Sequence, residues 1–590
     1  MRTHLRSKSW NKHWNTYMTH RNLPRKLLQQ EFHVHFVSTS PNARISEQYQ
    51  AFKTVIESTH TDPVPVEDES GNTTCFCLYM NGGPSDNPMQ SEVSGHIGGK
   101  GNRFCRKCNI GGMQKEKATN EGFHVLFEAR EPQLEKQVKL MGIKDEEELI
   151  QWTVDHRDKI YSAFLTIDGF DPTKDTPVKI LHTILLGVVK YIWHYSHTPW
   201  TPEQKKLYSV QLQSTNTDGL SIHAIHANYI MQYAGSLISR QFKTLSQTNI
   251  FHVRGLVTDH QFMAWKAVGE LVALFWVPEI KNIDEYKSSK RDLKVAVANV
   301  LDVFSLIDPS KMITKIKLHL LAHIDDDAIE FGPLVGVATE IFELFNAIFR
   351  YCSILSNHLA LSHDIALQLG DQEGLKYRLT GGCWFCCAEE GWRRAGPGIR
   401  HFMANHPVLQ RLLGWSEQKL LKQGEVKLEA LKSGEKKRPV FSLKSTTASK
   451  AVNYGLHSPE STWNRCSSVV GEQLDECFSG SWIFAQSATN TNSSGGITDI
   501  LTSKNTVIVV LEVFQVLSVR DNLYGMPVLV RRDGETSFTI LPAKNIKFKV
   551  NVQHDCCTAG CEATGERLQM QERVKSGKTE SFIVHQPLDC

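Results

Sequence analysis

Several common features are missing from this chain of 590 residues. No apolar stretch reaches the roughly 18 consecutive residues that a transmembrane helix needs, and the polar, His-rich N-terminus lacks the apolar core of a signal peptide. We therefore expect a protein of the nucleus or cytoplasm that is neither secreted nor embedded in a membrane. No GxGxxG, P-loop, GxSxG or HExxH motif stands in a strand or helix context, which excludes the usual nucleotide-binding and hydrolase classes.

Negative charge is missing from the start of the chain. The net charge is only +3, yet residues 1–30 contain no Asp or Glu. This arm contains seven basic residues: Arg2, Arg6, Lys8, Lys12, Arg21, Arg25 and Lys26. Such an arm is typical of a segment that contacts an anionic surface such as nucleic acid, and equally of a solvated terminus.

The patterns that are present predict a mostly helical α+β protein with several domains, because 590 residues are too many for one compact core. Alternation of apolar and polar residues predicts strands over 30–38 and 73–81. Helical spacing of apolar residues predicts helices over 45–58, 176–197, 261–276, 291–307 and 339–358, with a further helical pattern between 120 and 160. The predicted boundaries are an N-terminal part of the core at 1–180 and helical segments with the remainder of the core at 181–415.

The composition changes after Trp415. Residues 416–450 hold nine Lys or Arg against four Glu, which predicts a charged helix that runs into a linker up to residue 495. The stretch "QSATNTNSSGG" (486–496) is expected to be disordered. Beyond it, apolar β-type runs separated by turns predict a small β-rich domain over 496–590 with a Cys/His tail.

The fourteen cysteines favour thiols or metal ligands over disulfides, because several stand in close groups. In "FCRKC", Cys105 and Cys108 have the spacing at which two thiolates reach one zinc ion. One such pair is half of a site. The other half is left open among His96, Cys75 or Cys77, and the group "CWFCC" (383–387), while "HDCCTAGC" (554–561) is a second candidate.

The segment "TPVKILHTILLGVVKYIWHYSH" (176–197) carries Lys179 and His182 ahead of its apolar run. Residues three apart share one helix face. Without further context the lysine is interpreted as solvated and the histidine as partly buried.

Six blocks in this order give that context. They are "RSKSWNKHWNTYM", "QEFHVHFVSTSPNARISEQYQAF", "DNPMQSEVSGHIGGKGNRFCRKCNIGG", "TPVKILHTILLGVVKYIW", "DGLSIHAIHANYIMQYAGSLISRQFKTLSQ" and "EFGPLVGVATEIFELFNAIFRYCSILSNH". From residue 6 to about 415 the chain resembles the transposase of fungal CACTA-like DNA transposons of the Plavaka type, and its tail resembles their C-terminal extension. The resemblance implies an RNase H-like core with a helical insertion and three acids that hold two Mg²⁺ or Mn²⁺ ions for phosphodiester cleavage.

The three acids of the resembled family can be sought one by one. The first belongs just upstream of "RSKSWNKHW", where this sequence has only "MRTHL", so the acid and its strand are expected to be missing. The second precedes a histidine by three residues; His182 matches that histidine and Lys179 takes the place of the acid, with Asp168 or Asp175 as substitutes. The third matches Glu343 in "IFELFNAIFR".

Asn346 lies three residues after Glu343, and Glu340 is the neighbouring candidate for the third acid. At about 4 Å and an effective dielectric constant near 20, each pair of unit charges is worth roughly 4 kcal/mol, so Lys179 is expected to repel a metal ion. The family's CxxC matches Cys105 and Cys108 as a structural zinc turn, with a histidine at His96.

The sequence thus predicts a transposon-derived protein without DNA-cleaving activity. Two alternatives stay open. The fold is kept as a DNA- or protein-binding module that contacts DNA nonspecifically or at transposon ends, or the sequence is a fragment of an active two-metal transposase whose first acid lies upstream. The sequence indicates no oligomeric state.

Overall fold

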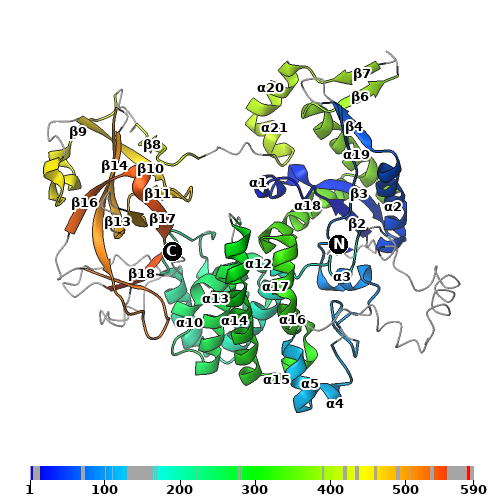
Figure 1. Cartoon of the computed structure of the whole chain (residues 1–590), viewed down its shortest axis with the longest axis horizontal. Coiled ribbons are helices and arrows are strands. Elements are labelled where there is room, and N and C mark those ends of the chain that lie inside the picture. Colours follow the sequence, from blue (N-terminus) through cyan, green and yellow to red (C-terminus); the bar gives the residue numbers. More distant parts are fainter. Residues whose placement is uncertain are drawn as a thin grey trace. The chain divides into compact units, whose positions relative to one another are not determined.

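The computed structural model describes residues 2–3, 13–67, 73–96, 98–99, 101–108, 110–128, 164, 167, 169–220, 222–276, 280, 282–387, 391–415, 421–431, 437–456, 462–486, 492–504, 506–531, 537–554 and 581–584 (Figure 1). The predicted α+β class is confirmed, with a β-rich C-terminal part. No helix among these residues combines the length and the apolar character that crossing a bilayer requires. The chain divides into two units, residues 1–195 with 259–418 and residues 196–258 with 419–590.

The first unit contains most of the helices. They are α1 (Arg25–Leu28), α2 (Ile45–Thr61), α3 (Asn87–Val93), α4 (Gln114–Lys117), α5 (Asn120–His124), α9 (Lys190–His197), α13 (Asp259–Phe275), α14 (Ile283–Ile307), α15 (Pro309–Thr314), α16 (Ile316–His319), α17 (Ile324–Phe331), α18 (Glu340–Ile354), α19 (Leu361–Leu379), α20 (Pro397–Asn405) and α21 (Pro407–Leu412). Its strands are β1 (Arg2–Thr3), β2 (His13–Met18), β3 (His35–Ser40), β4 (Val64–Glu67), β5 (Thr73–Phe76), β6 (Cys383–Cys386) and β7 (Gly391–Arg394). Shorter turns are η1 (Glu31–His33), η2 (Val125–Phe127), η7 (Leu320–His323) and the π-helix η4 (Ile180–Val189).

A small antiparallel sheet, β1-β2-β3, organises this unit. One apolar cluster joins Tyr17 and Phe36 of the sheet to Phe345 and Phe349 of α18 and to α19. A second cluster joins Trp14 of β2 to α2 and α3. The sheet therefore lies between two layers of helices. β1 consists of two residues that pair with β2, so the sheet that was predicted to lack its first strand has a short strand there without an acidic side chain.

The predicted helices at 261–276, 291–307 and 339–358 are present as α13, α14 and α18, since their apolar residues recur at helical spacing and are buried. Two predictions need correction. Residues 30–38 are a short turn, η1, followed by β3, rather than one strand. The segment 176–197 is the π-helix η4 followed by α9, and it begins after Lys179, whose backbone is extended.

The second unit combines short helices with a large sheet. Its helices are α10 (Pro202–Gln213), α11 (Ala227–Gln232) and α12 (Ser239–Thr248). Its strands are β8 (Val426–Leu428), β9 (Phe441–Ser442), β10 (Thr462–Val470), β11 (Glu476–Phe478), β12 (Trp482–Gln486), β13 (Asn492–Ser503), β14 (Thr506–Val516), β15 (Val528–Val530), β16 (Ser537–Pro542), β17 (Ile546–Val550), β18 (Val552–His554) and β19 (Ser581–Val584). The long hairpin β13–β14 pairs with β10, β12 and β16 around a core that includes Val509, Leu511 and Ile483.

The prediction of a charged helix and linker over 416–495 is wrong for the described residues. Residues 426–428 and 441–442 are the strands β8 and β9, which pair with β10, and β10, β11, β12 and the start of β13 also precede residue 496. The physical reason is that Val426 and Leu428 pack against the β-sheet core while Lys427, which stands between them, is exposed. Residues 492–496, expected to be disordered, begin β13, and residues 487–491 lie outside the described part.

The packing of α18 on the sheet gives a stability prediction. Phe345 is fully buried in that contact, whereas Phe402 on α20 is 55% exposed. We expect Phe345→Ala to lower the free energy of unfolding by about 3–5 kcal/mol, because it loses apolar burial and leaves a cavity. The matched change Phe402→Ala should stay within about 0.5 kcal/mol of wild type in urea unfolding. Equal effects of the two changes would contradict this packing.

Candidate metal centre and the region around Glu343

Two cysteines and two histidines converge in the first unit. The Sγ of Cys108 lies 3.3 Å from Nε2 of His319, and the Sγ of Cys105 lies 3.4 Å from Nε2 of His323. The two Nε2 atoms are 3.3 Å apart. All four ligand atoms lie within 4.8 Å of one another, and all four residues are buried. This set of thiols and imidazoles could hold a metal ion such as zinc.

Local structure explains why the four side chains point together. Cys105 and Cys108 stand on a turn that is closed by glycine: a Cβ on Gly111 (φ +141°) would lie 2.4 Å from the carbonyl oxygen of Asn102, so only glycine fits there. His319 ends α16 and His323 ends η7. Residues four apart on a helical segment share one face, so both imidazoles face the turn.

The surroundings of the centre favour metal binding. The Nδ1 of His319 lies 2.9 Å from the carbonyl oxygen of Leu126, which can only accept; Nδ1 therefore carries the proton and Nε2 offers its lone pair to the centre. Burial alone would raise the pKa of Cys105, but Cys108, His319 and His323 together lower it well below its ordinary value. A thiolate is the form of cysteine that binds metal.

The structure separates the predicted ligands into two groups. Cys105 and Cys108 are in the centre, but His96 is not: its Nε2 lies 2.9 Å from the carbonyl oxygen of Arg103 and its Nδ1 accepts from the N–H of Gly98. His96 is therefore occupied by the loop that holds the turn. Cys383 and Cys386 are on the hairpin β6–β7 and Cys75 is in β5, all outside the centre. His554 ends β18, and residues 556–561 lie outside the described residues.

The two histidine ligands were missed by the sequence analysis. "HLLAH" (319–323) has the H-x₃-H spacing that complements a CxxC pair in zinc sites, and this was the available signal. His319 follows Cys108 by 211 residues, so no local pattern connects the two halves.

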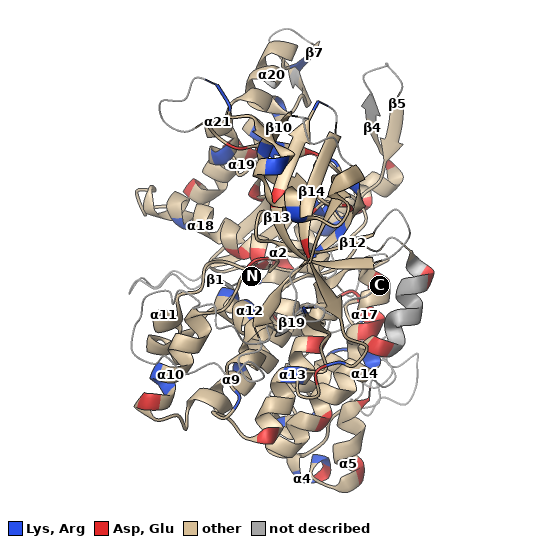
Figure 2. Ribbon diagram, turned by 90° about the vertical axis from the view of Figure 1, so that its left-hand side faces the viewer, with Lys and Arg blue, Asp and Glu red and all other residues tan. Residues whose placement is uncertain are grey.

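The two residues between the cysteines tie the turn to the segment that leads to Lys179. The buried Arg106 donates to Gln90 Oε1 (2.6 Å) and Thr176 Oγ1 (3.2 Å). Lys107 forms a buried ion pair with Asp327 (2.9 Å), whose other oxygen accepts from the N–H of Val178 (2.6 Å). Asp327 is the last of three acidic residues at the start of α17. Figure 2 colours the acidic and basic residues along the ribbon. The turn at residues 105–108 and residues 176–178 are thus one connected network.

Lys179 is not a solvated residue. Its side chain is buried, with 1% exposed, and its Nζ donates to the carbonyl oxygen of Val337 at 2.5 Å, just before α18. Burial lowers the pKa of Lys179 well below its ordinary value, against the opposing effect of Glu340. Of the proposed substitutes, Asp175 accepts from the N–H of Asp171 (2.7 Å), and Asp168 lies outside the described residues.

His182 and Glu343 lie together. Nε2 of His182 is 3.5 Å from Oε1 of Glu343, and Nδ1 of His182 is buried without a hydrogen-bond partner in the described part of the chain. Burial raises the pKa of Glu343 to about 7, helped by Glu340 and Asp86. Burial lowers the pKa of His182 to about 4, although Asp86 opposes this shift. Asn346 instead accepts from the hydroxyl of Tyr17 (3.1 Å).

Among the described residues, no set of carboxylates converges in the way that a pair of divalent metal ions needs. Such a pair needs several oxygen ligands converging on one place. Among the described residues, the Cys105–Cys108–His319–His323 set is the only group of three or more ligand side chains that converges. Asp86 caps α3 by accepting from the N–H of Met89 (2.9 Å), and the amine of Lys179 stands beside the start of α18.

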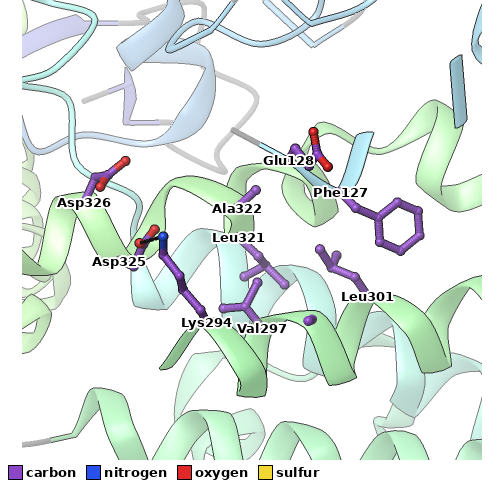
Figure 3. Close-up of a pocket in the computed structure, with 10 residues that line it drawn as sticks. Phe127, Glu128, Lys294, Val297, Leu301, Leu321, Ala322, Asp325 and Asp326 are labelled. Atoms are coloured by element: carbon purple, nitrogen blue, oxygen red, sulfur yellow. Dashed lines mark ion pairs between the residues drawn. The ribbon is translucent and has the colours of Figure 1, made fainter. Parts of the chain in front are cut away.

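A cavity of about 450 Å³ borders the segment that carries the two histidines (Figure 3). Its lining combines apolar residues of α14 and η7 with Glu128, Asp325 and Asp326. Lys294 from α14 points toward Asp325 and pairs with it at 3.3 Å. Leu321 and Ala322, which also line the cavity, stand between the two histidines in sequence.

Comparison with known families bears on the second unit alone. A family model described as a domain of unknown function (DUF8590) matches residues 426–590. No curated protein and no solved structure matches the chain. The matched range begins at the first residue of β8, which agrees with the β-rich part starting there rather than at residue 496.

The pKa of Glu343 gives a pH-dependent prediction. Between its ordinary value of 4.5 and about 7 the folded chain holds a proton that the unfolded chain has released. Stability therefore falls as pH rises through this window, and Glu343→Gln should remove the loss. Because the side chain is 36% exposed, we reduce the expected gain for solvent screening to about 1–2 kcal/mol at about pH 8, falling to near zero at about pH 5.

Urea unfolding of both proteins across this pH range would measure the difference. Glu121→Gln on the exposed surface of α5 is the matched control and should show no such pH trend. A gain from Glu343→Gln that does not depend on pH would contradict the buried-carboxyl interpretation.

Proposed function

We propose that this chain derives from a DNA transposase of the CACTA-like, Plavaka type and does not cleave DNA by the two-metal mechanism. The observation that carries the proposal is the position of Lys179. It stands where the resembled family has its second acid, and its buried amine binds Val337 at the approach to α18. The same helix carries Glu343, the counterpart of the third acid, in contact with His182. Residues matched to one catalytic site by resemblance are thus neighbours in space.

The arrangement around the small sheet supports an RNase H-like core. The antiparallel strands β2 and β3 are followed directly by α2, and α18 packs on the sheet through Phe345 and Phe349. A core of this class needs a helix that brings its acid to the sheet, and α18 occupies such a position with Glu343 in its first turn.

The chemistry argues against catalysis more strongly than charge does. In the resembled enzymes, bound Mg²⁺ or Mn²⁺ would activate the attacking oxygen and stabilise the leaving one. Because burial lowers the pKa of Lys179, its amine is charged over a narrower pH range than that of a surface lysine, so repulsion alone is the weaker argument. What remains is that an amine already bound to a carbonyl offers no oxygen ligand to a hard cation.

We further propose that the Cys105–Cys108–His319–His323 centre holds a structural zinc ion. Four protein ligands would fill a tetrahedral coordination sphere and leave no position for a substrate. The ion would connect the turn at 105–108 to the segment 316–323. Through Arg106 and Lys107 it would also hold residues 173–178 in place.

The absence of catalysis can be tested on DNA. A supercoiled plasmid carrying the genomic flanks of the gene should not be nicked by the full chain with Mg²⁺ or Mn²⁺ beyond the background of Glu343→Gln, because Lys179 stands where the resembled family has its second acid. Gel analysis of nicked and linear products measures this. Cleavage by the wild type that disappears in Glu343→Gln and persists in Glu121→Gln would overturn the proposal.

The zinc centre makes a separate prediction. We expect about one zinc ion per chain by elemental mass spectrometry of the purified protein. His319→Ala and Cys108→Ser should lose the ion and lower the melting temperature, since metal binding contributes to folding. His96→Ala is the matched control, because His96 lies outside the centre, and it should retain zinc. Equal loss from His96→Ala and His319→Ala would contradict this ligand set.

A further inference from the structure

α18 has a second apolar face that no described part of its unit covers. Along it lie Leu344 (57% exposed), Tyr351 (65%), Ile354 (65%) and Leu355 (77%), and the following loop adds Leu359 (88%). Spacings of seven, ten and eleven residues place the first four on one side of the helix. The opposite side, with Phe345 and Phe349, is already buried against the sheet. The helix is therefore apolar on two faces, of which one packs against the sheet and the other is exposed.

The exposed stripe is large enough to matter energetically. Five large side chains at these exposures present on the order of 600 Å² of surface, which is at the upper end of what a monomeric protein leaves open. Two such stripes in contact would bury on the order of 1,200 Å², the lower bound for a specific protein–protein interface.

We propose that the stripe on α18 is the interface between two copies of this chain, related by a two-fold axis, with the two α18 helices antiparallel. This pairing sets Leu344 of each copy against Ile354 of the other. It also sets Tyr351, the largest residue of the stripe, against Ala347, a small exposed residue on the same side of α18. The stripe is thus complementary to itself, as a two-fold interface requires.

The charges of α18 favour a second copy of this chain over a nucleic acid as the partner of the stripe. Arg350 is the one charged residue between Leu344 and Leu355, and its Nε donates to the carbonyl oxygen of Asn346 on its own helix. A phosphate backbone would require several cations along the surface. An apolar stripe without them suits a second apolar stripe. The inference does not depend on the proposed function.

Sedimentation velocity of the full chain over about 1–100 µM tests the proposal, and we expect a dimer with a dissociation constant near the micromolar range. Leu344→Lys and Ile354→Glu should each weaken association at least about 100-fold, because every change removes two contacts per dimer. The double variant should recover the dimer, since each lysine then meets a glutamate of the other copy. Val295→Lys on α14, 53% exposed, is the matched control and should behave as wild type.

Each result decides the question. A wild type that stays monomeric at all concentrations overturns the proposal, including the case in which the second unit of the same chain covers the stripe. A dimer that survives both single changes overturns it as well. Loss in both single variants without recovery in the double variant overturns the antiparallel pairing. Circular dichroism of every variant verifies that the exposed substitutions leave the fold intact.

Discussion

The first unit depends on one constraint, which is that four buried side chains converge: Cys105, Cys108, His319 and His323. Two sulfurs and two ring nitrogens face one another at 3.3–3.4 Å. Lone pairs that converge in an apolar interior repel one another unless a proton or a cation lies between them, so the arrangement is stable when a shared ion satisfies all four. Such an ion would also close a loop of more than 200 residues, whose ends are otherwise costly to hold together.

A series of side-chain contacts connects the Cys105–Cys108–His319–His323 centre to the start of α18. Lys107 pairs with Asp327, Asp327 accepts from Val178, and the next residue, Lys179, binds Val337 before α18 begins. Every side chain in this series is buried or forms a hydrogen bond with a backbone group. Removing one partner of the Lys107–Asp327 pair would leave an isolated buried charge, a loss of about 3–5 kcal/mol. The position of Glu343 beside His182 therefore rests on contacts that start at the turn at residues 105–108.

The helices that pack one apolar face were predictable from sequence, as α13, α14 and α18 show, because helical spacing is a local property. The CxxC half of the centre was predictable for the same reason. His319 and His323 were not assigned, because the fold rather than the sequence brings them to Cys105. The strands β8 and β9 were not predicted, because the many lysines of residues 416–450 hide Val426 and Leu428, which pack against the core. The replacement of the second acid by Lys179 stays a prediction, whereas the interpretation of Lys179 as a solvated residue is wrong, because its burial depends on packing that the sequence does not show.

The buried Lys179 also bears on how a catalytic site can be lost without loss of the fold. Carboxylates gathered for metal ions repel one another when no ion is bound, and an amine among them relieves part of that repulsion. Glu340 and Asp327 both act on Lys179 in the direction that favours its charged form, but burial outweighs them and lowers the pKa of Lys179. Glu343 lies farther along α18, and burial raises its pKa to about 7, so it keeps its proton up to about that pH. On the proposed ancestry, the contacts of Lys179 with Val337 and of Glu343 with His182 would hold this region together in place of a metal ion.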